Sequence, residues 1–140
     1  MDRETLKTIL PHREPMLLVD EAEMVSDTQS RGSYHVRGDE WFLQGHFPDN
    51  PVVPGVIQCE ILAQASCVLV ASKMKGTTPY FTGLNRVRFR RKVVPGDTIE
   101  IESAIVKEKA PFFFAEATGS VSGEVAVSAE FSFMLEKQGE

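Results

Sequence analysis

The chain has 140 residues, the length of one ordinary domain, with a hydrophobic fraction of 42% and a charged fraction of 25%. This composition is that of a globular protein and excludes a disordered chain. The net charge of −5 excludes binding to nucleic acid by bulk electrostatics, so any anionic partner must meet a local basic patch.

The cysteine positions and the N-terminus bear on the compartment. Cys59 and Cys67 lie eight residues apart in one predicted helix, about 12 Å along its axis at ~1.5 Å per residue. This is too far for a disulfide, so we expect two buried thiols in a reducing compartment. The N-terminus, MDRETLKTIL, lacks the apolar region of a signal peptide. No apolar run approaches the ~18 residues of a membrane helix, which favours a soluble, cytoplasmic protein.

The first forty residues predict a short N-terminal helix and two strands. Pro11 ends the helix, and the strands cover residues 16–25 and 30–38. In the second strand, Tyr34 and Val36 alternate with polar residues, so they are expected to face the core.

Residues 39–55 have the composition of a loop, and residues 56–73 predict the main helix of the chain. A helix that is apolar around most of its circumference is buried in the core. The apolar positions that indicate this are Val56, Ile57, Ile61, Leu62, Ala65, Val68 and Leu69.

The apolar period changes to two after residue 79, which predicts further strands separated by a turn over residues 95–97. The alternation in residues 80–94 places three arginines on one strand face. One buried helix and five or six mainly antiparallel strands make an α+β domain in which a sheet wraps a helix. The last strand is expected to put these residues on one face: Val125, Val127, Ala129, Phe131 and Phe133.

Two residues in and after the loop are candidates for acid–base chemistry. His46 precedes prolines at 48, 51 and 54, and although a lone histidine is more often structural, a stiff loop preorganises a base. Glu60 is either a solvent-facing glutamate or a carboxylate in an apolar wall, where burial favours its protonated form. Gln64, one turn on, is placed to hydrogen-bond it. A base and an acid of this kind suit β-elimination of water.

The start of the main helix is a candidate carbonyl site. The N–H of Gly55 and those just after it are unpaired donors at the positive end of the helix dipole. Such donors can hold the oxygen of a polarised thioester carbonyl, and a plain helix entry is the simpler explanation. Both explanations can hold at once.

The run RVRFRRK puts five cations into seven residues. It predicts either an edge strand protected by charge or a docking surface for an acidic or phosphorylated partner. The histidines and cysteines lack metal-ligand spacing, so the sequence predicts no metal site.

Four segments carry a resemblance to a known family: LPHREPMLLVD, GHFPDNPVVPGVIQCEILAQAS, FTGLNRVRFRRKVVPGD and the terminal strands. In this order, over nearly the whole chain, they resemble the bacterial 3-hydroxyacyl-[acyl-carrier-protein] dehydratases of the FabZ type. The resemblance implies a hotdog fold, a long central helix wrapped by an antiparallel sheet, with residues 1–140 as a single dehydratase domain. It also implies a lyase that converts (3R)-hydroxyacyl-carrier-protein to the trans-2-enoyl thioester in fatty acid biosynthesis, without a metal or redox cofactor.

The resemblance also implies roles for particular residues. His46 and Glu60 match the catalytic histidine and acid, which opposite subunits of a homodimer contribute in this family, typically within a trimer of dimers. Gly55 matches the backbone donor to the thioester carbonyl, and we expect further substrate contacts from Phe47, Pro54, Val56 and Gln64. The acyl carrier protein, whose phosphopantetheine arm brings the substrate, is expected to dock on Arg86, Arg88, Arg90, Arg91 and Lys92.

Two other functions stay open. A hotdog thioesterase would hydrolyse the same thioesters with a helix carboxylate, and a non-catalytic acyl-thioester-binding partner would keep the fold alone. The presence of both His46 and Glu60 favours the dehydratase over each of them. Glutamate at position 60 favours the FabZ type over the related dehydratase-isomerase, FabA, while isomerase activity within the FabZ type stays open. Gln58 and Cys59 replace two usually apolar residues, which leaves the preferred acyl chain length open.

Overall fold

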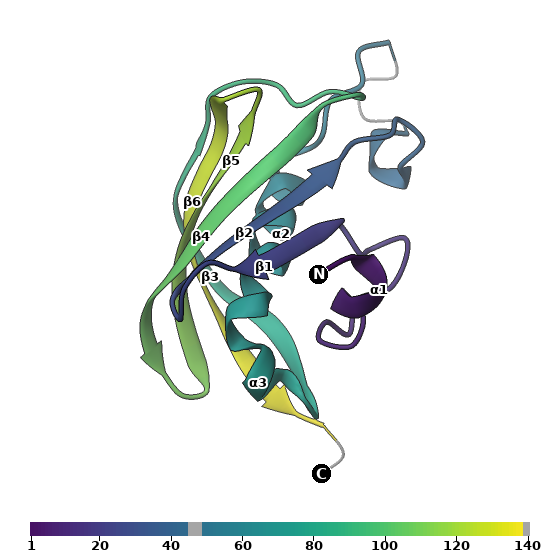
Figure 1. Cartoon of the computed structure of the whole chain (residues 1–140). Helices are drawn as coiled ribbons and strands as arrows, with labels where there is room; N and C mark the ends of the chain where they lie inside the picture. The colour runs from purple at the N-terminus through teal and green to yellow at the C-terminus, as the bar shows by residue number, and fades with distance from the viewer. Residues whose placement is uncertain (45–48, 139–140) are drawn as a thin grey trace.

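A computed structural model describes residues 1–44 and 49–138 of the chain. Six antiparallel strands form one sheet in the order β1-β2-β4-β5-β6-β3, and the sheet curls around the helix α2 (Figure 1). The elements follow one another as α1 Arg3–Leu6, β1 Glu21–Met24, β2 Gln29–His35, the 3₁₀ helix Trp41–Leu43, α2 Gly55–Ser66, the 3₁₀ helix Cys67–Val70, α3 Ala71–Met74, β3 Thr77–Phe89, β4 Thr98–Lys109, β5 Phe112–Val121 and β6 Glu124–Lys137.

The core lies between α2 and the inner face of the sheet. Ile61 and Leu62 on α2 are fully buried, and α2 contacts β2, β4, β5 and β6. Gly119 on β5 permits this close packing, because a Cβ there would lie 3.0 Å from Ile99 and 3.4 Å from Leu62. The predicted α+β architecture, a sheet wrapped around a buried helix, is therefore confirmed.

The helix predicted over residues 56–73 is divided in the structure, because the α-helix α2 ends at Ser66 and a 3₁₀ helix joins it to α3. Together with the 3₁₀ helix and α3, α2 forms a 20-residue helical run, Gly55–Met74. The most apolar 18 residues of this run have a mean hydropathy of 1.5. By length and composition this run could cross a membrane, so the expectation that no run approaches that length was wrong. However, 61% of this 18-residue stretch is buried inside the protein, and the core helix of a soluble protein can be equally long and apolar.

The first predicted strand is shorter than expected, because β1 begins at Glu21. The preceding backbone satisfies its hydrogen bonds with side chains instead of a strand ladder. Leu18 N–H donates to the amide oxygen of Gln64 at 2.8 Å, and the Arg3 guanidinium donates to the carbonyls of Leu17 and Val19 at 3.1 and 3.2 Å. The segment is buried like a strand but is tied to α1 and α2.

Register shifts between neighbouring strands overturn the simple alternation expected in β3 and β6. The register between β3 and β6 shifts between Asn85 and Arg88, and Arg86 has a positive φ of 50°, so the arginines do not share one regular strand face. Between β5 and β6, Gly119 pairs with Val127 and Ser120 pairs with Val125, so β6 has one extra residue at this point. Val125 is consequently exposed, whereas the other four residues predicted for that face are buried.

Candidate active site

Glu60 lies on the second turn of α2, with 21% of its side chain exposed. The predicted contact with Gln64 is present: the Gln64 amide donates to Glu60 Oε2 at 2.8 Å. Residues four apart on a helix lie on the same face, which explains why the spacing alone predicted this pair. The carboxyl group is therefore held at one oxygen.

Gln64 is itself fixed from both ends. Its amide oxygen accepts from Leu18 N–H, and its amide nitrogen also donates to the carbonyl of Met16, each at 2.8 Å. Both polar atoms of this buried side chain thus contact the chain itself, so Gln64 supports Glu60. Contact of Gln64 with substrate stays a prediction.

His12 is a second neighbour of Glu60 that the sequence analysis missed. Its Nε2 lies 3.4 Å from Glu60 Oε2, the same oxygen that Gln64 holds. The Nδ1 atom of His12 is buried and has no hydrogen-bond partner among the described residues. Forty-eight residues separate the two side chains in the sequence, and the only available signal was their joint presence in the family-like segments.

His46 and Phe47 lie outside the described residues. The other predicted substrate contacts in this region, Pro54, Gly55 and Val56, form the start of α2. The carbonyl of Pro54 accepts from the N–H groups of Ile57 and Gln58, at 3.0 and 3.1 Å. Within the described part of the chain, the N–H groups of Gly55 and Val56 make no hydrogen bond, so both can bind an added oxygen.

Gly55 also faces a pocket of about 580 Å³. The aromatic ring of Phe89 packs on Gly55 so closely that a Cβ at position 55 would lie 2.7 Å from the end of the ring, so a larger residue there requires this half-exposed ring to move. Glu60 does not line this pocket, so Gly55 and Glu60 point from α2 into different surroundings. The lining residues are Val52, Val53, Gly55, Gln58, Phe89, Arg90, Arg91 and Lys92.

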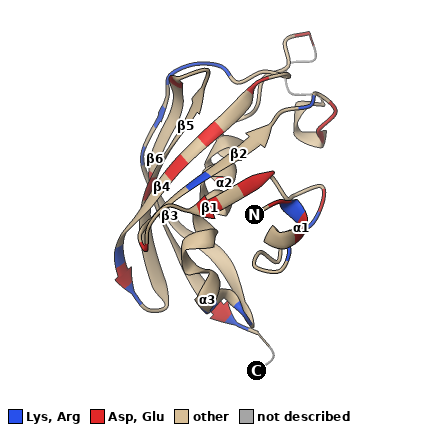
Figure 2. Cartoon of the chain, in the orientation of Figure 1, with Lys and Arg blue, Asp and Glu red and all other residues tan. Residues whose placement is uncertain are grey.

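The five predicted docking cations follow β3 and the connection after it (Figure 2). Arg88, Arg90 and Lys92 are exposed and make no ion pair within the described residues. Arg91 is held by Asp97 and Glu124 at 3.6 and 3.2 Å. Arg91 therefore stabilises the connection to β4, and the exposed cations are the ones open to a partner. Arg86 lies 3.8 Å from Glu130, at an exposed site.

Burial and hydrogen bonds shift the pKa values of two other ionisable groups, Cys67 and Glu40. Burial, with a smaller contribution from the charge of Glu60, raises the pKa of the Cys67 thiol to about 12. Glu40 accepts hydrogen bonds from the Tyr34 hydroxyl and from the N–H groups of Arg37 and Gly38. Burial alone would raise the pKa of Glu40, but these bonds outweigh it and hold the pKa below its usual range. Both cysteines are free thiols, as predicted.

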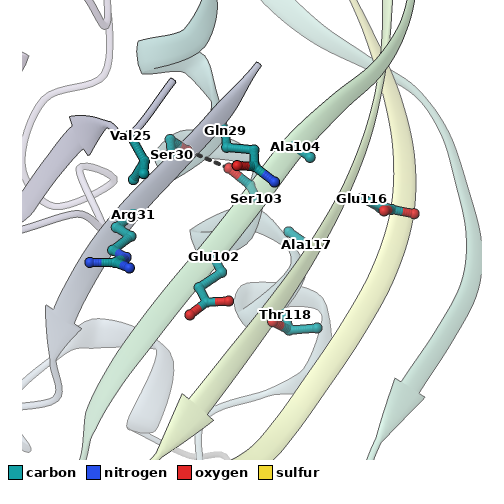
Figure 3. A pocket seen from close by; sticks show the side chains of 10 residues that line it. All are labelled: Val25, Gln29, Ser30, Arg31, Glu102, Ser103, Ala104, Glu116, Ala117 and Thr118. Atoms are coloured by element: carbon teal, nitrogen blue, oxygen red, sulfur yellow. Dashed lines mark hydrogen bonds between the residues drawn. The ribbon is translucent and has the colours of Figure 1, made fainter. Parts of the chain in front are cut away.

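A second hollow, of about 300 Å³, lies on the face of the sheet that points away from α2 (Figure 3). It is lined by exposed charged side chains such as Arg31, Glu102 and Glu116, on β2, β4 and β5. It lacks the helix start and the Glu60–Gln64 pair. Among residues 1–44 and 49–138, no group of three His, Cys, Asp or Glu side chains could hold a metal ion.

Comparison with known proteins shows the family to which the chain is similar. A family model described as a FabA-like domain matches residues 10–130. The chain is 43% identical over 137 residues to the 3-hydroxyacyl-[acyl-carrier-protein] dehydratase FabZ of Clostridium perfringens (strain SM101), covering 96% of this chain and 99% of that protein. It is 44% identical over 135 residues to the FabZ of Clostridium novyi, covering 94% and 95%.

One solved structure has the same fold. The dehydratase heterocomplex ApeI:P from Xenorhabdus doucetiae superposes with a TM-score of 0.81, covering 95% of this chain and 91% of that one. At 22% identity this likeness concerns the fold alone, and it supports the hotdog architecture predicted from the sequence.

Proposed function

The chain belongs to the FabA-like family, and we propose that it eliminates water from (3R)-hydroxyacyl-acyl-carrier-protein to give the trans-2-enoyl thioester in fatty acid biosynthesis. We take residues 1–140 as one soluble, cytoplasmic hydro-lyase domain. The substrate is linked to the phosphopantetheine arm of the carrier protein.

The observation that carries the mechanism is the fixed carboxyl group of Glu60. Its Oε2 is held by Gln64, and no described residue makes a polar contact with Oε1, which leaves one oxygen for substrate. In the proposed reaction His46 removes the acidic proton at C2, the C2–C3 double bond forms, and Glu60 protonates the departing 3-hydroxyl, which leaves as water. The N–H groups of Gly55 and Val56 bind the thioester oxygen, where negative charge develops.

We further propose that two subunits of a homodimer complete each site, within a trimer of dimers. The support within one chain is that Gly55 and Glu60 face different surroundings. Thirteen-residue β3 is an edge strand, and such edges pair readily with another chain. Four apolar side chains of β3 are exposed: Tyr80, Phe81, Leu84 and Phe89. Val56, at the start of α2, is 75% exposed.

The dehydratase proposal is tested with carrier-linked 3-hydroxyacyl substrates and with the reverse hydration of a crotonyl thioester, followed by loss of enone absorbance. His46→Ala and Glu60→Gln should each lower kcat by about 10²–10⁴-fold while the fold is retained. Glu100→Gln, on the exposed outer face, is the matched control and should keep full activity. Release of free carrier thiol without enoyl product would identify a thioesterase, and binding without turnover a non-catalytic partner.

The proposal that two subunits share each active site is tested by mixing two inactive variants. If subunits exchange, a mixture of the His46→Ala and Glu60→Gln proteins should regain activity, because every mixed dimer contains one intact pair. Recovery should reach about a quarter of the wild-type rate at equal amounts, since half of the dimers are mixed and each has one whole site. Absence of recovery after exchange has been demonstrated by mass would indicate that each chain forms its own site.

Carrier docking is tested by reversing charge at Arg88 and Arg90, which are exposed and free of ion pairs within the described residues. The double change should raise KM for carrier-linked substrate at least about tenfold and leave KM for a small thioester mimic unchanged, because only the acidic carrier uses the long-range attraction. The double change Lys107→Glu with Lys109→Glu, at two exposed cations near the end of β4, alters the net charge by the same amount and is the control. Equal effects on both substrates would mean that the two arginines have a structural role.

A further inference from the structure

The segment that carries His12 is held in place independently of the histidine ring. The Arg13 guanidinium donates to the carbonyls of Leu10, His12 and Lys7, at 2.9, 2.7 and 3.2 Å. Leu10 and Leu17, on either side of the segment, are buried in the core. Removal of the imidazole should therefore leave the backbone of this segment where it is.

The imidazole has one polar neighbour among the described residues, and it is Glu60. The 3.4 Å between His12 Nε2 and Glu60 Oε2 is longer than a formed N–H···O hydrogen bond, which spans about 2.7–3.2 Å. Hydrogen bonds within active sites are often long before substrate binds and shorten in the complex. The Gln64 amide donates to the same oxygen at 2.8 Å. Two side chains, one before and one after Glu60 in the sequence, therefore lie next to Oε2.

The buried, unpartnered Nδ1 of His12 indicates which nitrogen carries the hydrogen. A buried N–H group without an acceptor costs about 1–3 kcal/mol, so the hydrogen is more stable on Nε2, where Glu60 accepts it. His12 then donates a hydrogen bond from Nε2 to the carboxyl group, and its unprotonated nitrogen, Nδ1, is buried and does not act as a base on the substrate.

We propose that His12 is a positioning residue for the dehydratase reaction: together with Gln64 it holds Oε2 of Glu60, so that Oε1 is presented to the departing hydroxyl. The inference rests on the proposed function, because it requires Glu60 to be the acid. His12 and Glu60 belong to the same chain, so His12 acts in whichever site Glu60 enters.

The test compares His12→Gln, His12→Asn and His12→Ala. A glutamine amide nitrogen can reach the position of Nε2, whereas that of asparagine ends near Nδ1 and is too short. The Asn and Ala variants should lose about tenfold or more in kcat with KM within about twofold, because a misplaced acid slows the chemistry and leaves binding intact. The Gln variant should stay within about threefold of wild type. His35→Gln, an exposed histidine bonded to Thr98, is the control and should be neutral.

A double variant separates positioning from a general structural effect. If His12 acts through Glu60, His12→Ala combined with Glu60→Gln should be no slower than Glu60→Gln alone. Additive losses, or Gln and Asn variants of equal activity, would overturn the inference. An inactive wild type or a fully active Glu60→Gln would instead refute the proposed function, so the two failures are distinguishable.

Discussion

Gln64 links the catalytic helix to the segment before β1, and its replacement by methionine should cost stability as well as activity. Methionine has a similar length but no hydrogen-bonding amide. The Gln64→Met change removes the acceptor of Leu18 N–H and the donors to the Met16 carbonyl and to Glu60 Oε2. Leu18 N–H is buried, so no water replaces the lost acceptor.

The expected loss follows from these contacts. A buried N–H without a partner costs about 1–3 kcal/mol, and the partly buried Met16 carbonyl adds up to about 1 kcal/mol because water reaches it more easily. The free energy of unfolding should therefore fall by about 1–4 kcal/mol. With an unfolding entropy of about 2.1 cal/mol/K per residue, a 140-residue domain should lose about 3–14 °C in Tm.

The assay is denaturant unfolding at one fixed protein concentration, since association also contributes to stability. The matched control is Gln58→Met on the same helix. Gln58 is also buried, but it makes one hydrogen bond, to the Val53 carbonyl at 3.1 Å, and its amide oxygen has no partner within the described residues. Its replacement should change the free energy of unfolding by less than about 1 kcal/mol. A Gln64→Met loss no larger than that of the control would refute the reasoning.

Three further predictions follow from the buried groups and the helix start. Hydrogen bonds keep the pKa of Glu40 low in the fold, so its contribution to the free energy of unfolding is full above the pKa of the unfolded chain, about 4.3, and is lost as the pH falls below that value. The stability difference between wild type and Glu40→Gln should therefore shrink from pH 7 to pH 3 in denaturant titrations. A constant difference would contradict this. With a pKa of about 12, roughly one Cys67 thiol in ten thousand is ionised at pH 8, so iodoacetamide should modify it only after unfolding, and rapid labelling of the native protein would disprove its burial. Gly55→Ala should lower kcat because its Cβ collides with the Phe89 ring, and Phe89→Ala in the same chain should restore part of the loss if that collision is the cause.

Local patterns in the sequence were sufficient for the elements whose neighbours are close in the chain. The apolar run of α2 predicted a buried helix, and the four-residue spacing predicted the Gln64–Glu60 hydrogen bond. Helical geometry alone determines both features. The period of two likewise predicted β4, β5 and β6, which are regular over most of their length.

The apolar pattern of the sequence predicted the wrong structure where contacts between distant parts of the chain decide the conformation. The bulges in β3 and β6 each shift the register, and their positions depend on the partner strand. The residues before β1 have the apolar composition of a strand, yet their backbone bonds to Arg3 and Gln64, which are distant in sequence.

By itself, the sequence predicted the fold class, because the periods of its apolar residues encode the buried helix and the strands. The roles of His46 and Glu60 stay predictions. The tertiary structure alone decided how Glu60 is held. Gln64 reaches Leu18 across 46 residues, and His12 reaches Glu60 across 48, only because the segment before β1 packs along α2. Only the tertiary structure shows that Gly55 faces a pocket to which Glu60 does not contribute.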